Sequence, residues 1–367
     1  MEAIISNIAG ISWQMIVMWI IGGVLIYLAI KKDMEPTLLL PMGFGAIMVN
    51  LHLPFSGEIG DYGVLTTLFD AGIATELFPL ILFIGIGAMI DFGPLLSNPK
   101  LMIFGAAAQF GIFFTLCTAS MFFDLKDAAS IAVIGAADGP TSIVVANQLK
   151  SNYIGAIMVA AYSYMALVPI IQPPVIKLLT TKKERLIRME YKEATVSQTT
   201  KILFPIIITV IAGLVAPESV SLIGFLMFGN LLRECGVLNS LSETAQKVLA
   251  NLVTIFLGIT IATKMNAKEF LQVDTLLIMG LGLFAFIFDT AGGVLFAKFL
   301  NLFLKKKINP MIGAAGISAF PMSGRTVHKM ALKEDPQNFL LMHSIGVNVS
   351  GQIASVIAGG LILTFFG

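Results

Sequence analysis

One acidic residue, Asp138, interrupts a long apolar stretch of this 367-residue chain, which there reads IGAADGPTSIVVANQL. If the stretch lies inside a membrane, an unpaired carboxylate costs several kcal/mol and marks a functional site. Sodium, a hard cation, prefers oxygen ligands, and Thr141, Ser142 and exposed backbone carbonyls would supply more of them. The alternative is a capping role, because an Asp before Gly-Pro is common in turns. Membrane depth favours the functional interpretation.

A second stretch with helix-breaking residues reads NPMIGAAGISAFPMSGRTVHKM and begins at Asn309. It contains no acid, but Ser318 falls almost opposite Asp138 when the two halves of the chain are aligned, and it could supply a neutral oxygen to the same site. Arg325 falls near the end of the stretch. It could bind an incoming carboxylate through two parallel hydrogen bonds, or it could be a positive-inside arginine that reaches the interface. The residues leave both alternatives open.

Other polar residues give weaker signals. Tyr164 follows the first interrupted stretch and could either reach its tip or pack between helices. Asp289 lies in an apolar run, at the position of the second half that corresponds to Gln109 in the first, and is best explained by a structural hydrogen bond between helices. The corresponding late helix of the chain carries the polar residues Asn348, Ser350 and Ser355.

The composition places these residues in a membrane. The chain is 57% hydrophobic and 12% charged, with a mean hydropathy of +0.89. Soluble domains contain about 25% charged residues, so lipid must be the solvent. The net charge of +1 gives no reason to expect a nucleic-acid partner. Residues 1–12 lack Lys and Arg, so the first apolar run, which ends at Lys31-Lys32, is predicted to be a transmembrane helix and not a signal peptide.

Twelve apolar stretches follow one another along the chain, each near the roughly 20 residues that a span needs. They cover about 13–30, 36–53, 75–92, 100–123, 128–148, 153–178, 202–216, 219–235, 246–263, 273–303, 308–327 and 338–366. The long polar interval Lys177–Lys201 divides them. The expected organisation is therefore a membrane repeat over 1–176, a charged cytoplasmic loop over 177–201 and a second membrane repeat over 202–367.

Short matches relate the two halves. Three pairs recur with a nearly constant offset: GAA at 135 and 313, GF at 43 and 224, and FIGI at 83 with FLGI at 256. Each pair alone is weak, because Gly and Ala are common in membrane helices. Together they predict an internal repeat.

The distribution of charge predicts how the repeats are oriented. If all twelve stretches span, the 23 Lys and Arg divide 14 to 9 between the two sides. If 128–148 and 308–327 are re-entrant, the division becomes 19 to 4, which the positive-inside rule prefers. Five spans per half then make the repeats inverted, with turns at 137–140 and 315–318 and an ion site at the midplane. Broken spanning helices stay open as an alternative. The predicted fold is an all-α polytopic membrane protein.

The motifs GAADGPTSIVVANQL, NPMIGAAGISAFPMSGRTVHKMAL and NVSGQIASVIAGG resemble the β subunit of sodium-pumping biotin-dependent decarboxylases. These enzymes act on oxaloacetate, methylmalonyl-CoA, glutaconyl-CoA and related acids. The resemblance runs over nearly the whole chain. It implies that the chain is a translocase of the bacterial inner membrane that decarboxylates carboxybiotin, takes up a proton from outside and exports sodium.

The resemblance also implies roles for single residues. The essential aspartate corresponds to Asp138 and the downstream tyrosine to Tyr164, while Arg325 would hold carboxybiotin. The sodium-binding residues implied are Asp138, Asn309, Gly313, Ser318 and Asn348. The implied partners are a carboxyltransferase α subunit, a biotin carrier subunit and a small membrane-anchor subunit, with a homo-oligomer also compatible. The short chain favours an acyl-CoA decarboxylase over the oxaloacetate type.

A sodium-coupled secondary transporter of a small carboxylate is the alternative, since inverted repeats with re-entrant segments also occur there. Fold-level likeness cannot separate the two classes. Dependence on partners can separate them. A secondary transporter works alone, whereas a β subunit needs a biotinylated carrier subunit. The chain has no Met-Lys-Met attachment motif, so biotin would arrive on another polypeptide.

Overall fold

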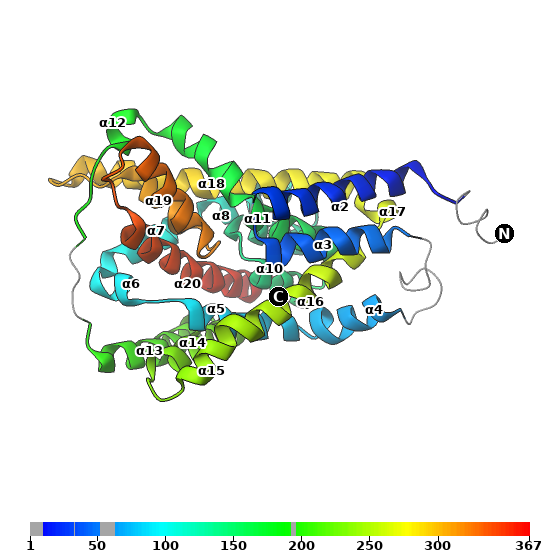
Figure 1. The fold of residues 1–367 in the computed structure, drawn as a ribbon, viewed down its shortest axis with the longest axis horizontal. Coiled ribbons are helices and arrows are strands. Elements are labelled where there is room, and N and C mark those ends of the chain that lie inside the picture. The colour runs from blue at the N-terminus through cyan, green and yellow to red at the C-terminus, as the bar shows by residue number, and fades with distance from the viewer. Residues whose placement is uncertain (1–9, 33, 52–62, 192–195) are drawn as a thin grey trace.

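The computed structural model describes residues 10–32, 34–51, 63–191 and 196–367, and in these ranges every regular element is helical (Figure 1). This agrees with the predicted all-α fold. Residues 1–9, 33, 52–62 and 192–195 lie outside the described part of the chain, including the end of the predicted stretch 36–53 and part of the charged loop.

The described residues contain seven helices long and apolar enough to cross a membrane. They are α2 (Trp13–Lys32), η2–α7–α8 (Pro99–Ala119), α11 (Ile154–Leu179), α13 (Gln198–Val215), α15–η5–α16–η6 (Asn239–Lys264), α18 (Val273–Phe303) and α20 (Leu341–Phe366). The pair Val64–Ala74 (α4, η1) and Leu77–Met89 (α5) would be an eighth span, bent by 62°. The remaining predicted spans form shorter helices, α3 (Pro36–Val49) and α14 (Val220–Glu234), of 14 and 15 residues.

The spans differ in how deeply the protein buries them. In α13 only 11% of the residues are buried. Its outward face carries Ile207, Val210 and Leu214, all exposed. In α20 the corresponding fraction is 67%. Exposed apolar side chains suit a helix that faces lipid, whereas α20 lies at the centre of the bundle.

The first interrupted segment is a hairpin. It consists of α9 (Leu125–Ala132), η3 (Val133–Ala136), a break at Ala137-Asp138, and α10 (Gly139–Gln148). Asp127, near its start, accepts hydrogen bonds from the Ser151 hydroxyl at 2.6 Å and from the backbone and side-chain nitrogens of Asn152 at 3.0 and 3.1 Å. The two ends of the segment therefore lie together.

The second interrupted segment also returns to its starting point. It consists of η7 (Pro310–Gly316) and α19 (Met322–Glu334), with Asn309 before it and Asn338 after it. Both asparagine side chains donate to the same two carbonyls, those of Arg185 and Ile187, at 2.8 to 3.3 Å. The predicted turn over 315–318 lies slightly further along, because the non-helical residues are 317–321.

The bases of the two hairpins lie at opposite ends of α11. The base of the first hairpin, at Ser151-Asn152, lies just before the start of α11. The base of the second hairpin contacts the charged linker that follows the end of α11. A helix of 26 residues is about 39 Å long, enough to cross the membrane. Entry of the two hairpins from opposite sides of the membrane, as the charge distribution predicts, stays a prediction that this placement supports. That the two halves are inverted repeats stays a prediction.

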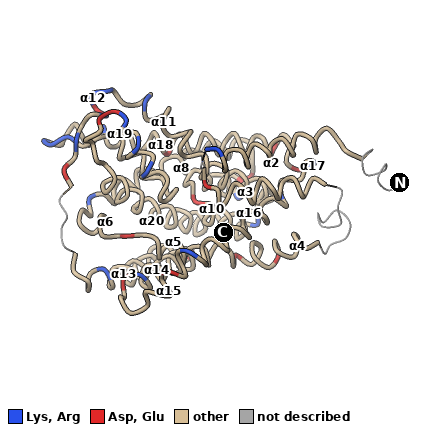
Figure 2. Tube along the Cα trace, viewed as in Figure 1, with Lys and Arg blue, Asp and Glu red and all other residues tan. Residues whose placement is uncertain are grey.

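The charged linker is held against the second hairpin where it is described. It contains α12 (Lys182–Arg185), and Arg185 forms a 2.8 Å ion pair with Glu334 of α19. Charged residues gather around α12, α19 and the end of α18 (Figure 2). Short helices complete the description: α6 (Gly93–Ser97), η4 (Pro217–Ser219) and α17 (Ala267–Phe270).

Candidate functional site at the hairpin tips

Asp138 both caps a helix and presents a carboxylate inside the protein. Ala137, with φ of 52°, turns the chain, and Asp138 becomes the N-cap of α10. Its Oδ1 accepts from the Thr141 backbone nitrogen at 3.4 Å. Its Oδ2 accepts from the hydroxyl of Thr141 at 2.8 Å, Nε2 of Gln352 at 2.9 Å and the hydroxyl of Ser355 at 3.1 Å. The capping role is thus confirmed, and the functional role of this buried carboxylate stays a prediction.

The hydrogen bonds of Asp138 leave room for a cation. The side chain is 3% exposed, and its three side-chain donors are all neutral. A carboxylate has about four lone-pair sites, and Oδ1 is engaged only by the long bond from Thr141. No Lys or Arg pairs with Asp138 among the described residues. The site can therefore accept a sodium ion or a proton at Oδ1.

The tips of the two hairpins touch beside this carboxylate. The backbone nitrogen and the hydroxyl of Ser318 donate to the Ala136 carbonyl at 3.1 and 2.5 Å. Helix α20 packs against the second tip, where Nδ2 of Asn348 donates to the Ile317 carbonyl at 2.7 Å. Oδ1 of Asn348 is buried without a partner among the described residues and could accept from a ligand.

A cavity of about 180 Å³ opens at this junction. Its lining includes Asp138, Ser318, Gln352 and Tyr162. The Tyr162 ring fills the space beside Gly139, where an added Cβ would collide with the ring. The Tyr162 hydroxyl is buried and has no partner among the described residues. This tyrosine, absent from the residues singled out by sequence, contributes an unused oxygen to the cavity of Asp138.

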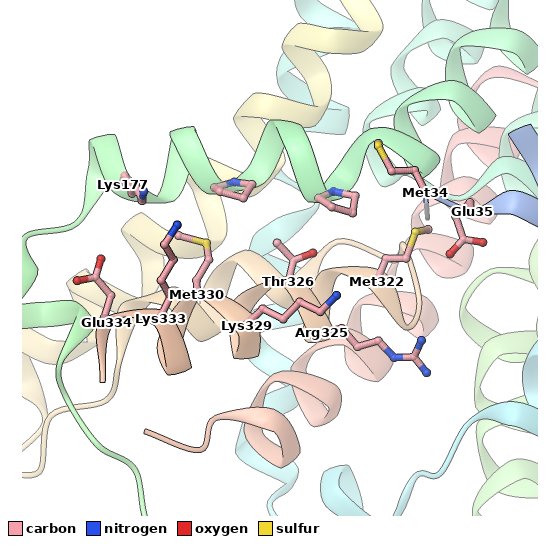
Figure 3. Close-up of a pocket in the computed structure, with 12 residues that line it drawn as sticks. Met34, Glu35, Lys177, Met322, Arg325, Thr326, Lys329, Met330, Lys333 and Glu334 are labelled. Atoms are coloured by element: carbon pink, nitrogen blue, oxygen red, sulfur yellow. The ribbon is translucent and has the colours of Figure 1, made fainter. Parts of the chain in front are cut away.

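A basic groove lies next to the cavity, between α11 and α19, with a volume of about 340 Å³. Figure 3 shows Arg325 on α19 at the end of the groove that also holds Met322, Met34 and Glu35. Glu35 lines both the groove and the Asp138 cavity. Arg325 is exposed and has no ion-pair partner among the described residues. An anion in the groove could therefore use its full hydrogen-bonding capacity.

Residues 14–366 match the family described as the Na+-transporting oxaloacetate decarboxylase beta subunit. The chain belongs to this family. It is 50% identical over 348 residues to the methylmalonyl-CoA decarboxylase subunit beta of Veillonella parvula, covering 95% of this chain and 92% of that protein. It is 47% identical over 363 residues to the glutaconyl-CoA decarboxylase subunit beta of Acidaminococcus fermentans, with 99% and 96% covered. It is 44% identical over 409 residues to the oxaloacetate decarboxylase beta chain of Klebsiella pneumoniae, with 95% and 94% covered.

In this β subunit, Tyr164 points away from the cavity. Its hydroxyl donates to the Met279 carbonyl of α18, and its ring packs against Gly282. Residues two apart on a helix face different directions, which is why Tyr162 and Tyr164 have different surroundings. The expectation that Tyr164 could reach the tip is not met in this conformation. The catalytic role that the resemblance implies for it stays a prediction.

Asn309 and Gly313 hold the second hairpin in place. Both amide hydrogens of Asn309 are directed to linker carbonyls, and its Oδ1 accepts from the Met311 nitrogen at 3.1 Å. A Cβ on Gly313 would collide with the Gly293 carbonyl, so only glycine permits this crossing with α18. Neither residue lines the cavity of Asp138. Their implied sodium-binding roles stay predictions.

Sequence reasoning passed over Gln352 and gave Ser355 little weight. A signal was available, because Asn348, Gln352 and Ser355 are spaced i, i+4 and i+7 and therefore share one helical face. The acid that Gln352 and Ser355 contact lies in the other half of the chain. Spacing alone could identify the polar face but not the acid that it contacts.

Asp289 confirms the expected structural bond between helices. One oxygen of its buried carboxylate accepts a short hydrogen bond from the Gly111 nitrogen, at the start of α8. This bond satisfies an orphan donor of the helix terminus. The other oxygen lies close to Gly135 in the first hairpin. Asp289 thereby ties α18 to α8, and its Oδ2 is buried beside the first hairpin without a partner among the described residues.

Proposed function

We propose that this chain decarboxylates carboxybiotin delivered by a biotinylated carrier subunit and couples this reaction to sodium export and proton uptake. The observation that carries the proposal is the Asp138 carboxylate, buried where the tips of the two hairpins touch. Its cavity adjoins a groove containing Arg325, and Glu35 lines both. A site for a cation and a site for a carboxylate are thus neighbours.

Asp138 serves as the coupling group in this proposal. Its carboxylate holds sodium with further oxygen ligands, for which Ser318 at the second tip, Asn348 of α20 and Tyr162 of α11 are candidates. A proton replaces sodium on the same carboxylate once the ion leaves toward the outside. Export of one sodium ion against 100 mV requires about 2.3 kcal/mol, which decarboxylation must supply through tight coupling.

Arg325 acts on the other substrate. Its guanidinium binds the carboxylate of carboxybiotin, while Met322 and Met34 contact the ring system. When the carbon–nitrogen bond breaks, carbon dioxide leaves and the electron pair remains on the ureido nitrogen of biotin. That nitrogen takes a proton, so the reaction consumes the proton that Asp138 gives up when it binds sodium. One carboxylate thereby links both events.

The proposed assembly contains a carboxyltransferase α subunit, a biotin carrier subunit and a small membrane-anchor subunit. The transferase selects the acid that is decarboxylated, so this chain works with carboxybiotin whatever the parent acid. The secondary-transporter alternative is not favoured, because the relatives are named as decarboxylase subunits.

The test uses the purified chain with free or carrier-bound carboxybiotin, with and without sodium, beside Asp138→Asn. We expect sodium-stimulated release of carbon dioxide by the wild type and its loss in the variant. Retention of sodium-coupled decarboxylation by Asp138→Asn would refute the role of this carboxylate. Inert carboxybiotin combined with sodium-dependent carboxylate uptake into liposomes would instead identify a secondary transporter.

A further inference from the structure

Three cations follow one face of α19 along the basic groove. Arg325, Lys329 and Lys333 are spaced four residues apart, and Lys177 of α11 faces Lys333 across the groove (Figure 3). A rise of 1.5 Å per residue places the backbones of Arg325 and Lys333 about 12 Å apart. We call Lys177, Lys329 and Lys333 the outer lysines.

The positive charge of the groove is not neutralised by the residues that the structure describes. None of the outer lysines forms an ion pair with another described residue. Two acids line the groove. Glu334 is already paired with Arg185, and Glu35 lies at the Arg325 end, away from Lys177 and Lys333. Four cations in one groove repel each other, so the arrangement favours an anionic occupant.

Carboxybiotin would occupy only the end of the groove that contains Arg325. Its single carboxylate is matched by Arg325, and the neighbouring Pro169, Pro173 and Met322 offer apolar contacts to a ring. Lys333 on α19 and Lys177 on α11 lie at the other end of the groove, and Lys329 lies between them and Arg325 (Figure 3). Positive charge therefore remains in surplus where the polypeptide carrying the biotin must approach.

We infer that the outer lysines form a docking surface for an acidic face of the biotin carrier subunit, around its biotinylated residue. The inference rests on the proposed function and adds to it the surface that the partner contacts. Charge complementarity of this kind accelerates encounter and fixes orientation more than it adds affinity. The groove thus guides the carrier so that its biotin enters with the carboxylate toward Arg325.

The test compares Lys329→Glu/Lys333→Glu with Lys182→Glu/Lys183→Glu. The control lysines lie on α12 of the charged linker, next to α19. They are exposed and do not line the groove. Each protein is reconstituted in neutral phosphatidylcholine vesicles and assayed with the carboxylated carrier subunit and with free carboxybiotin. The milder Lys329→Gln/Lys333→Gln is assayed alongside, in case charge reversal impairs folding.

For the groove variant we expect KM for the carboxylated carrier to rise at least tenfold at low salt, with kcat within twofold. KM for free carboxybiotin should change less than threefold. Added salt should raise the wild-type KM for the carrier but leave that of the groove variant nearly constant, because screened charges contribute little. The control variant should follow the wild type throughout.

Three results would overturn the inference. An equal rise in KM for free carboxybiotin would mean that the lysines hold the small substrate itself. An unchanged KM for the carrier in neutral vesicles, with an effect only when anionic lipid is added, would assign the lysines to lipid headgroups. A wild-type chain inactive on both substrates would instead refute the proposed function, and the docking surface with it.

Discussion

Nε2 of Gln352 lies 2.9 Å from Oδ2 of Asp138, although 214 residues separate them along the chain. Helix α20 thereby reaches the tip of the first hairpin through a side-chain amide. The contact orients the carboxylate so that Oδ1, with its unused lone pairs, is left for a cation. Gln352 is therefore a positioning residue for the proposed sodium site.

Replacing Gln352 by leucine should weaken sodium binding. A hydrogen bond to a charged group contributes roughly 1.5–3 kcal/mol, so the sodium concentration at half-maximal decarboxylation should rise about tenfold or more. The exposed Gln337→Leu is the matched control, and its sodium dependence should stay that of the wild type. An unaltered sodium requirement in Gln352→Leu would exclude a positioning role.

The two tyrosines of α11 should respond differently to loss of their hydroxyls. Tyr162→Phe removes an oxygen that has no described protein partner, so sodium dependence should change severalfold while Tm stays close to that of the wild type. Tyr164→Phe removes the bond to Met279, so unfolding should become easier by about 1 kcal/mol. Sodium titrations and thermal unfolding of both variants provide the measurement. Altered sodium dependence only in Tyr164→Phe would favour the role implied by the resemblance.

The base of the second hairpin should loosen in Asn338→Leu. This change removes the donor to the Arg185 and Ile187 carbonyls and leaves Asn309 as their only described side-chain donor. Local opening should become easier by about 1 kcal/mol, seen as roughly fivefold faster hydrogen exchange over 185–189. The exposed Asn239→Leu serves as control. Equal exchange in all three proteins would show that Asn338 does not hold the linker.

The start of the linker should detach in acid. Burial raises the pKa of Glu184, but hydrogen bonds from Thr181 and the ion pair with Lys298 lower it and prevail. A lowered pKa in the folded state means that the stabilisation is present at neutral pH and is lost as the pH falls below the ordinary pKa of a glutamate and through that lowered pKa. Hydrogen-exchange protection over 181–186 should therefore decrease there. Glu184→Gln should abolish this pH dependence, and a variant that kept it would implicate another group.

The sequence by itself determined the membrane class, the apolar segments and the two interrupted stretches. Hydropathy and helix-breaking Gly and Pro are local properties, and residues that share a helix face are fixed by helical periodicity. Asp138 was identifiable for the same reason, as an acid within an apolar stretch. The inverted relation between the halves rests on short matches and charge counts, and it stays a prediction.

Only the tertiary structure decided which side chains meet. Asp127 and the pair Asn309 and Asn338 close the hairpins. Gln352 and Ser355 of the other half contact Asp138 in addition to its neighbour Thr141. The choice between Tyr162 and Tyr164 depended on which face of α11 packs against α18. Contacts between residues far apart in the chain depend on how helices are rotated and placed against each other, and the spacing of residues along one helix does not specify this.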